Sequence, residues 1–368
     1  MMRVWMQESV PPRSFYDERP GRWIAEGCWP SAGIVDRRFH LNPGRLDPEP
    51  APAVEISFRS PQTTGLRAGE WCAFGAEGEM PLDQRPDDGR SLTFDTGPLP
   101  RRLEILGAPI VRLEVIVDKP DALVAVRLND VAPDGASTQV TYGLLNLAHH
   151  RGHDRPEPLR PGQRTAATVK LNDIAHAFPA GHCIRLAIST SNWPIAWPSP
   201  ENVTLTLSTG NSTLSLPERP PSASDEKAWP FGRPEAAPSI EPKKLRLFPL
   251  KRTVENDRTT NETIYTLESD AGEFGGASLA RIEAIDMDAG YRLRRQHRIR
   301  ETDPLSASTE LSQEVVLRRS EWSVRVAVRT RLTSTRDHFR FEGELQAFEG
   351  GETVSERRWD LDIPRALV

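Results

Sequence analysis

Apolar and polar residues alternate along much of this chain, which is the pattern of strands that bury one face. Two runs show this pattern clearly. In the first, one strand face carries Val111, Leu113, Val115 and Val117, and in the second, one face carries Val124, Val126 and Leu128. Similar runs predict strands at 139–147, 165–171, 184–190 and 203–207. Short strands separated by turn residues favour a jelly-roll β-sandwich over residues 46–217.

A second region of alternating strands follows a proline-rich break. Eight prolines occur from Pro217 to Pro249, both included, and proline cannot donate to a sheet ladder, so residues 218–249 are expected to form an extended connector. Residues 322–330 and 338–347 then alternate again. They predict a smaller antiparallel β domain at 250–368, with an Arg-rich face that is solvated rather than a docking surface. Helical periodicity is scarce, so the predicted fold class is all-β.

The net charge indicates which partners this chain is not expected to bind, and the cysteine content indicates its cellular compartment. The 47 Lys and Arg against 52 Asp and Glu give a net charge of −5, too weak a field to recruit nucleic acid or an anionic membrane. The three cysteines, Cys28, Cys72 and Cys183, are expected to be unpaired and buried. Without a secretory signal or an apolar run of 18 residues, the chain is expected to be cytoplasmic.

The most distinctive stretch runs from Pro81 to Val115 and reads P-L-D-Q-R-P-D-D-G-R-S-L-T-F-D-T-G-P-L-P-R-R-L-E-I-L-G-A-P-I-V-R-L-E-V. It resembles a segment of the cocaine-esterase and X-Pro dipeptidyl-peptidase group of serine hydrolases (CocE/NonD type). The resemblance continues through residues 172–189, 191–200 and 359–368, with Cys183 where members commonly carry Arg. It implies a C-terminal jelly roll that follows an α/β-hydrolase domain carrying Ser, Asp and His.

The G-x-S-x-G motif of a nucleophile elbow does not occur in these 368 residues. Residues 1–45 resemble the last strand and closing segment of the family's hydrolase domain, which come after the catalytic His. By resemblance they are a remnant of that domain, so no catalytic residue is expected in this chain. Exposed apolar surface is then expected near Trp5, Trp23 and Trp29, where a hydrolase domain would pack.

Two groups of residues could carry chemistry of their own. His149, His150, His153 and Asp154 could ligate zinc, but adjacent residues of a strand point to opposite faces, so no metal and no cofactor are expected. A Ser-His-Asp set can be drawn from Ser189 or Ser191, His176 or His182, and Asp173. A sandwich turn offers no helix N-terminus for an oxyanion hole, which argues against such a triad.

Aromatic residues give the candidate binding site. Trp71, Phe74, Trp193 and Trp197 could stack on a ligand or fill the core. Each of Trp193 and Trp197 precedes a proline, which stiffens its loop, and in the family such loops border the active site. By resemblance, we assign Trp71, Trp193 and Trp197 to the wall of a substrate pocket.

These expectations combine into one functional hypothesis. The chain is predicted to be the non-catalytic C-terminal part of a serine hydrolase, where it shapes the pocket and docks an α/β-hydrolase domain, upstream or in a separate chain. The substrate would be a small acyl ester or peptide, and a homo-oligomer is allowed. The alternative is a free-standing jelly-roll module that binds carbohydrate or peptide.

Overall fold

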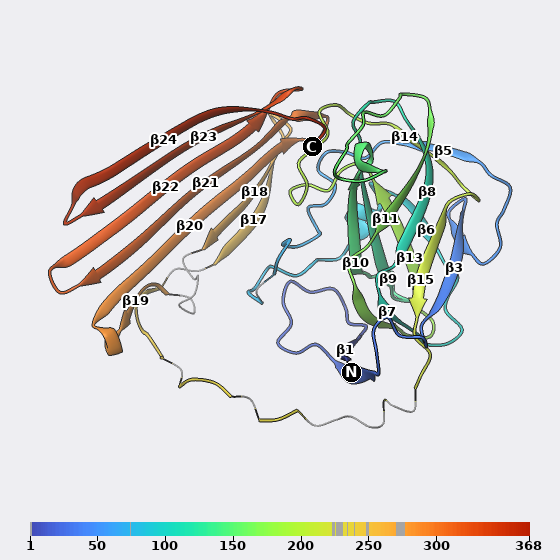
Figure 1. Ribbon diagram of the computed structural model, residues 1–368, viewed down its shortest axis with the longest axis horizontal. Coiled ribbons are helices and arrows are strands. Elements are labelled where there is room, and N and C mark those ends of the chain that lie inside the picture. The colour runs from blue at the N-terminus through green and yellow to red at the C-terminus, as the bar shows by residue number, and fades with distance from the viewer. Residues whose placement is uncertain are drawn as a thin grey trace. The chain divides into compact units, whose positions relative to one another are not determined.

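The computed structural model describes residues 2–73, 75–222, 225, 231–233, 235–238, 240–247, 250–269 and 277–368. The chain divides into two compact units, which are Met1–Phe231 with Leu367–Val368, and Gly232–Ala366. The regular secondary structure of both is almost entirely strand, so the all-β prediction is confirmed (Figure 1). The domain boundaries drawn from the sequence stay predictions. In the described part of the chain, no helix has the length and apolar character needed to cross a membrane.

The first unit is a β-sandwich whose pairings are mostly antiparallel. Its strands and short helix are β1 (Met2–Glu8), β2 (Gly21–Glu26), β3 (Val35–Asn42), β4 (Arg45–Asp47), β5 (Glu55–Phe58), α1 (Arg85–Asp88), β6 (Leu92–Asp95), β7 (Leu103–Gly107), β8 (Ile110–Val117), β9 (Leu123–Val131), β10 (Ser137–Asn146), β11 (Arg164–Lys170), β12 (Ile174–Phe178), β13 (Cys183–Ser189), β14 (Leu205–Ser208) and β15 (Thr213–Glu218). The predicted strands at 139–147, 165–171, 184–190 and 203–207 correspond to β10, β11, β13 and β14 within about two residues at each end.

The core of the first unit lies where the alternating pattern places it. Val111, Val115 and Val117 of β8 are buried with Val124 and the other inward residues of β9 in one apolar cluster. β9 departs from the pattern because its other face is buried as well, including residues 127 and 129. β9 was expected to expose one face to solvent, but both of its faces are buried.

The N-terminal residues belong to the same sheet. β1 pairs in parallel with β12, and β2 pairs antiparallel with β1 as the last strand of the sheet path. Met6 and Ile24 pack with Leu106, Ala175 and Ala177 in a second, smaller apolar cluster. The hairpin is therefore fixed to the sandwich by both backbone pairing and apolar burial.

The second unit is an antiparallel sheet with long strands (Figure 1). Its strands are β16 (Lys243–Leu247), β17 (Lys251–Asp257), β18 (Glu262–Ser269), β19 (Ala277–Ile282), β20 (Met287–Arg300), β21 (Asp303–Arg319), β22 (Trp322–Ser334), β23 (His338–Glu349) and β24 (Glu352–Pro364). β22 and β23 confirm the strands predicted at 322–330 and 338–347. β16 lies inside the segment predicted as an extended connector.

The cysteine expectation is partly wrong. All three thiols are free, but Cys28 and Cys72 are exposed, because both lie in irregular turns outside the strands. Cys183 is half-buried at the start of β13, where burial raises the pKa of its thiol.

Candidate functional site

The aromatic loop that follows β13 packs against the sandwich. The backbone N–H of Trp193 donates to the carbonyl of Thr64 over 2.8 Å, and its side chain is only 1% exposed. The half-buried Trp197 contacts it edge to face, with ring centroids 5.5 Å apart and planes at 73°. Trp193 therefore fills the interior, and Trp197 lies at its edge.

Trp71 lies in a different loop and has a different environment. Its side chain is 76% exposed. The base of its loop is closed by backbone bonds from Glu70 to Glu79 and from Leu82 to Arg67. The structure thus brings Trp193 and Trp197 together and leaves Trp71 open to solvent, while Phe74 lies outside the described residues. The pocket-wall assignment of Trp71, Trp193 and Trp197 stays a prediction.

The hydroxyl groups of both serines in the hypothetical triad donate hydrogen bonds to backbone carbonyl groups. Ser189 Oγ donates to the carbonyl of Ser191 over 2.9 Å, and Ser191 Oγ donates to the carbonyl of Gln62 over 3.1 Å. Both serines are buried, and among the described residues neither hydroxyl bonds a histidine. Asp173 is exposed and pairs with Lys170 at 3.8 Å. The set drawn from the sequence is not assembled.

Both histidines of that set contact a carboxylate that the sequence reasoning missed. His176 Nε2 lies 3.2 Å from Asp130 Oδ2, and His182 Nδ1 lies 2.7 Å from Asp130 Oδ1. Asp130 is 2% exposed and continues the inward series 124, 126 and 128 of β9. A charged residue at an inward strand position was the signal that could have identified it, because a buried charge needs partners.

Burial and hydrogen bonding have opposite effects on the pKa of Asp130 and of His176. Burial alone would raise the pKa of Asp130, but hydrogen bonds from His176, Ser9 and His182 outweigh it and hold the pKa below its usual value. Burial lowers the pKa of His176, although Asp130 opposes this effect. Asp130 is therefore ionised, and the neutral form of His176 is favoured beside it.

A second buried network lies under the stretch that carried the resemblance. Asp88, at the end of α1, accepts from Asn129 at 2.9 Å and Ser137 at 2.8 Å. Arg185 bonds Asp88 at 3.1 Å, and the guanidinium of Arg127, which is 1% exposed, lies 3.5 Å away. Asp88, from the stretch 81–115, thus offsets the charge of Arg127 and bonds Asn129 on the second face of β9. These contacts allow the polar side chains of that face to be buried.

The histidine cluster after β10 is held by contacts within its own loop and by one contact to the C-terminal residues of the chain. His149 Nδ1 lies 3.1 Å from His153 Nδ1, and His149 Nε2 contacts the carbonyl of Leu367 at 2.8 Å. His150 Nδ1 contacts the carbonyl of Leu147, and Asp154 is exposed. Over the described ranges, no three His, Cys, Asp or Glu side chains gather in a metal-binding arrangement.

An aromatic cluster lies at the β1–β2 hairpin and consists of the half-buried Trp5 and the exposed Trp23 of the hairpin with the exposed Phe231. The Trp5 and Trp23 rings are 5.3 Å apart, those of Trp23 and Phe231 are 4.6 Å apart, and Arg3 lies 4.3 Å over the Phe231 ring. Trp23 is 43% exposed, and Trp29, in the turn after β2, is 47% exposed. This apolar surface lies on the hairpin where the sequence predicted it.

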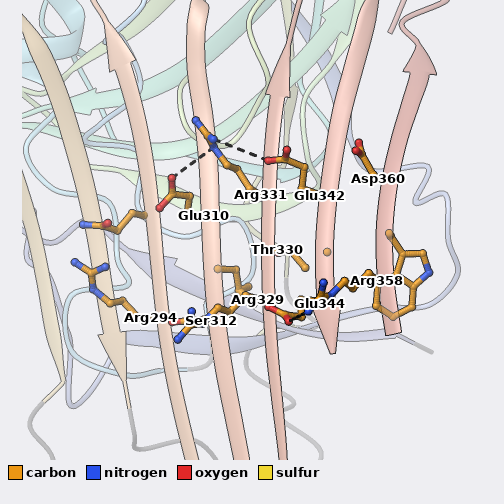
Figure 2. Close-up of a pocket in the computed structure, with 14 residues that line it drawn as sticks. Arg294, Glu310, Ser312, Arg329, Thr330, Arg331, Glu342, Glu344, Arg358 and Asp360 are labelled. Atoms are coloured by element: carbon orange, nitrogen blue, oxygen red, sulfur yellow. Dashed lines mark hydrogen bonds and ion pairs between the residues drawn. The ribbon is translucent and has the colours of Figure 1, made fainter. Parts of the chain in front are cut away.

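The second unit has a hollow of about 840 Å³ on one face of its sheet. Figure 2 shows that its charged side chains form two rows across the strands. One row contains Arg294, Ser312, Arg329, Glu344 and Arg358, and the other contains Gln296, Glu310, Arg331, Glu342 and Asp360. Sequence reasoning identified this face only as solvated and Arg-rich, because its rows depend on strand register.

Comparison with known proteins gives a family match for the first unit. The model of the X-Pro dipeptidyl-peptidase C-terminal non-catalytic domain matches residues 2–227. A Mycobacterium bovis protein named "Putative serine esterase" is 28% identical over 204 residues, covering 49% of this chain and 32% of that protein. The cocaine esterase of a Rhodococcus species is 28% identical over 116 residues, covering 31% of this chain and 20% of that enzyme. The matches therefore span a third or less of these relatives.

Solved structures give partial matches. An aminopeptidase from a Thaumarchaeota archaeon covers 54% of this chain and 39% of its own, with a TM-score of 0.48 and 18% identity. An α-amino acid ester hydrolase covers 50% of this chain and 36% of its own, with a TM-score of 0.43 and 24% identity.

Proposed function

Because the chain belongs to the family of X-Pro dipeptidyl-peptidase C-terminal non-catalytic domains, we propose that it works as the non-catalytic part of a CocE/NonD-type serine hydrolase. The observation that carries the proposal is the family match over residues 2–227. The partner is an α/β-hydrolase domain, encoded in frame upstream or by a neighbouring gene. Its Ser would attack the carbonyl carbon of an acyl ester or X-Pro peptide, its His would take the proton and its Asp would orient the His.

We propose that the hydrolase domain docks on the β1–β2 hairpin. Trp23 is 43% exposed and lies between Trp5 and Phe231, so its ring is positioned before a partner arrives. Aromatic residues and arginine are the side chains that most often dominate protein interfaces, and Arg3 lies over the same cluster. β2 is also the last strand of its sheet path, which leaves its outer edge available to a partner.

The proposed role of Trp71, Trp193 and Trp197 is to line the substrate pocket once the hydrolase domain is bound. The 76% exposure of Trp71 supports direct contact with a ligand. Trp193, at 1% exposure, would act by holding Trp197 in place through their ring contact. In reconstituted enzyme, Trp71→Ala should raise the KM for ester substrates, and unchanged kinetics would remove Trp71 from the pocket wall.

Docking is tested by a matched pair of tryptophan variants. Trp23→Ser should weaken the complex with the hydrolase domain about tenfold or more, measured as Kd by analytical ultracentrifugation, because a central aromatic residue carries much of an interface's energy. Trp322→Ser is the control, since Trp322 is also 43% exposed but lies in the second unit. Equal Kd values for the wild type and both variants would show that the hydrolase domain docks elsewhere.

A further inference from the structure

The hollow in the second unit carries opposite charges on its two rows, and the family model does not reach it. The basic row, defined by residues 294, 312, 329, 344 and 358, holds three arginines and one glutamate, for a net charge of +2. The acidic row, defined by residues 296, 310, 331, 342 and 360, holds three carboxylates and one arginine, for a net charge of −2. Figure 2 shows the rows one above the other.

Neighbouring groups leave part of this charge unbalanced. Arg294 pairs with Glu268 at 2.9 Å, Arg358 with Glu344 at 3.4 Å, and Asp360 with Arg340 at 2.9 Å. Among the described residues, the side chain of Arg329 makes no hydrogen bond or ion pair, although its backbone belongs to the pairing of β22 with β21 and β23. On the other row, Glu310 and Glu342 share Arg331 at 3.6 and 3.9 Å. A free cation thus lies on one row, and incompletely paired carboxylates lie on the other.

The register of the sheet places the free cation beside a hydroxyl. Ser312 of β21 is directly opposite Arg294 of β20 and Arg329 of β22. Ser312 and Arg329 can therefore bind one carboxylate through a hydroxyl and a guanidinium donor, and Arg294, whose Nε pairs with Glu268, has its two Nη groups left to contribute. Two residues further along β21, Glu310 offers an acceptor to a cation.

The separation of the two rows along the strand matches a ligand of about two residues. Residues on one face of a strand that are two positions apart lie about 6.6 Å apart. An extended peptide of two residues spans about 6.6 to 7.2 Å from its amino end to its carboxyl end. A single amino acid, whose ammonium and carboxylate groups lie closer together than the two rows, matches this spacing less well.

We propose that this hollow binds a free dipeptide in its zwitterionic form. The ligand lies along β21, its carboxylate is held by Arg294, Ser312 and Arg329, and its ammonium group contacts Glu310. The hollow of about 840 Å³ leaves room for both side chains of the dipeptide. The inference stands on the charge pattern and register of the second unit, and it does not depend on the proposed function of the first.

Calorimetric or NMR titration of the full chain with Ala-Ala tests the proposal. Because the charged groups are partly exposed, we expect a Kd on the order of 1 mM that weakens as salt is added. N-acetyl-Ala-Ala, Ala-Ala-amide and alanine, which each lose one charge or the required length, should bind about tenfold more weakly or not at all. Equal binding of the blocked peptides, or no saturable binding of Ala-Ala, would overturn the proposal.

Two variants locate the site. Arg329→Gln and Glu310→Gln should each weaken Ala-Ala binding about tenfold, and neither side chain is buried, so the fold should persist. Arg357→Gln, on the opposite face of β24, is the matched control and should bind as the wild type does. Circular dichroism checks the fold of each variant. Wild-type affinity in Arg329→Gln would remove the basic row from the site and refute the proposal.

Discussion

Asp130 contacts two histidines, one on a strand that does not pair with its own and one next to a strand that does. It lies on β9, His176 lies on β12, and His182 immediately precedes β13. The alternation of apolar residues indicates that position 130 faces inward, but it cannot indicate which distant side chains meet there. Asp173, which is nearer to both histidines in sequence and was the candidate partner, is exposed.

Acid should destabilise the first unit through His176. Because burial lowers the pKa of His176, protonation favours the unfolded chain, where the pKa is about 6.5. The free energy of unfolding should be highest above about pH 6.5 and should fall as the pH drops below that value. It should fall further below about pH 4, as Asp130 is protonated. The measurement is Tm by near-UV circular dichroism across this range.

The control for this pH dependence is a second histidine. His176→Asn should flatten the Tm profile between about pH 5 and 6.5, whereas substitution of the exposed His338 should leave it unchanged. A Tm of the wild type that does not vary in this window would contradict the assignment.

Removing the carboxylate of Asp88 should be more damaging than removing an exposed one. Asp88→Ala leaves Arg127, at 1% exposure, without its carboxylate, which should cost about 3 to 5 kcal/mol of unfolding free energy. Asp154→Ala, at an exposed position, should cost less than about 0.5 kcal/mol. Urea titration measures both, and similar values would show that Arg127 does not depend on Asp88.

At the scale of elements, the strands were the most predictable part. β8, β10 and β22 follow from period-two alternation, which is local and can be identified residue by residue. The four-residue helix α1 was not predicted, because it is too short for a helical period to show. The pairing of the 60–65 loop with the aromatic loop was also out of reach, because it depends on backbone contacts between distant segments.

Gly65 is the position that tests this loop pairing. Its φ is +107°, and a Cβ there would lie 2.7 Å from the backbone carbon of Asn192, next to Trp193. Gly65→Ala should therefore cost about 1 to 3 kcal/mol and change the fluorescence of the buried indole. Gly27→Ala is the control, because a Cβ there meets nothing within 4 Å. If both variants are equally stable, the close approach does not constrain the loop.

At the scale of the whole molecule, the two units differ in how far sequence comparison describes them. The first matches a family of non-catalytic domains, and its resemblance was recognisable from the stretch Pro81–Val115. The second lies entirely beyond that match, and its rows of charge appear only when the register of the long strands is known. The fold class was therefore predictable for both units, whereas the polar hollow was not.

Under the proposed function, this chain would contribute to hydrolysis without catalysing it. The most direct measurement is steady-state hydrolysis of p-nitrophenyl butyrate and an X-Pro-p-nitroanilide by the purified chain, alone and after addition of the hydrolase domain. Alone, the chain should be no faster than an albumin control, and with the hydrolase domain it should raise turnover above that of the domain by itself. Saturable turnover by the chain alone that disappears in Ser189→Ala or Ser191→Ala would contradict the account.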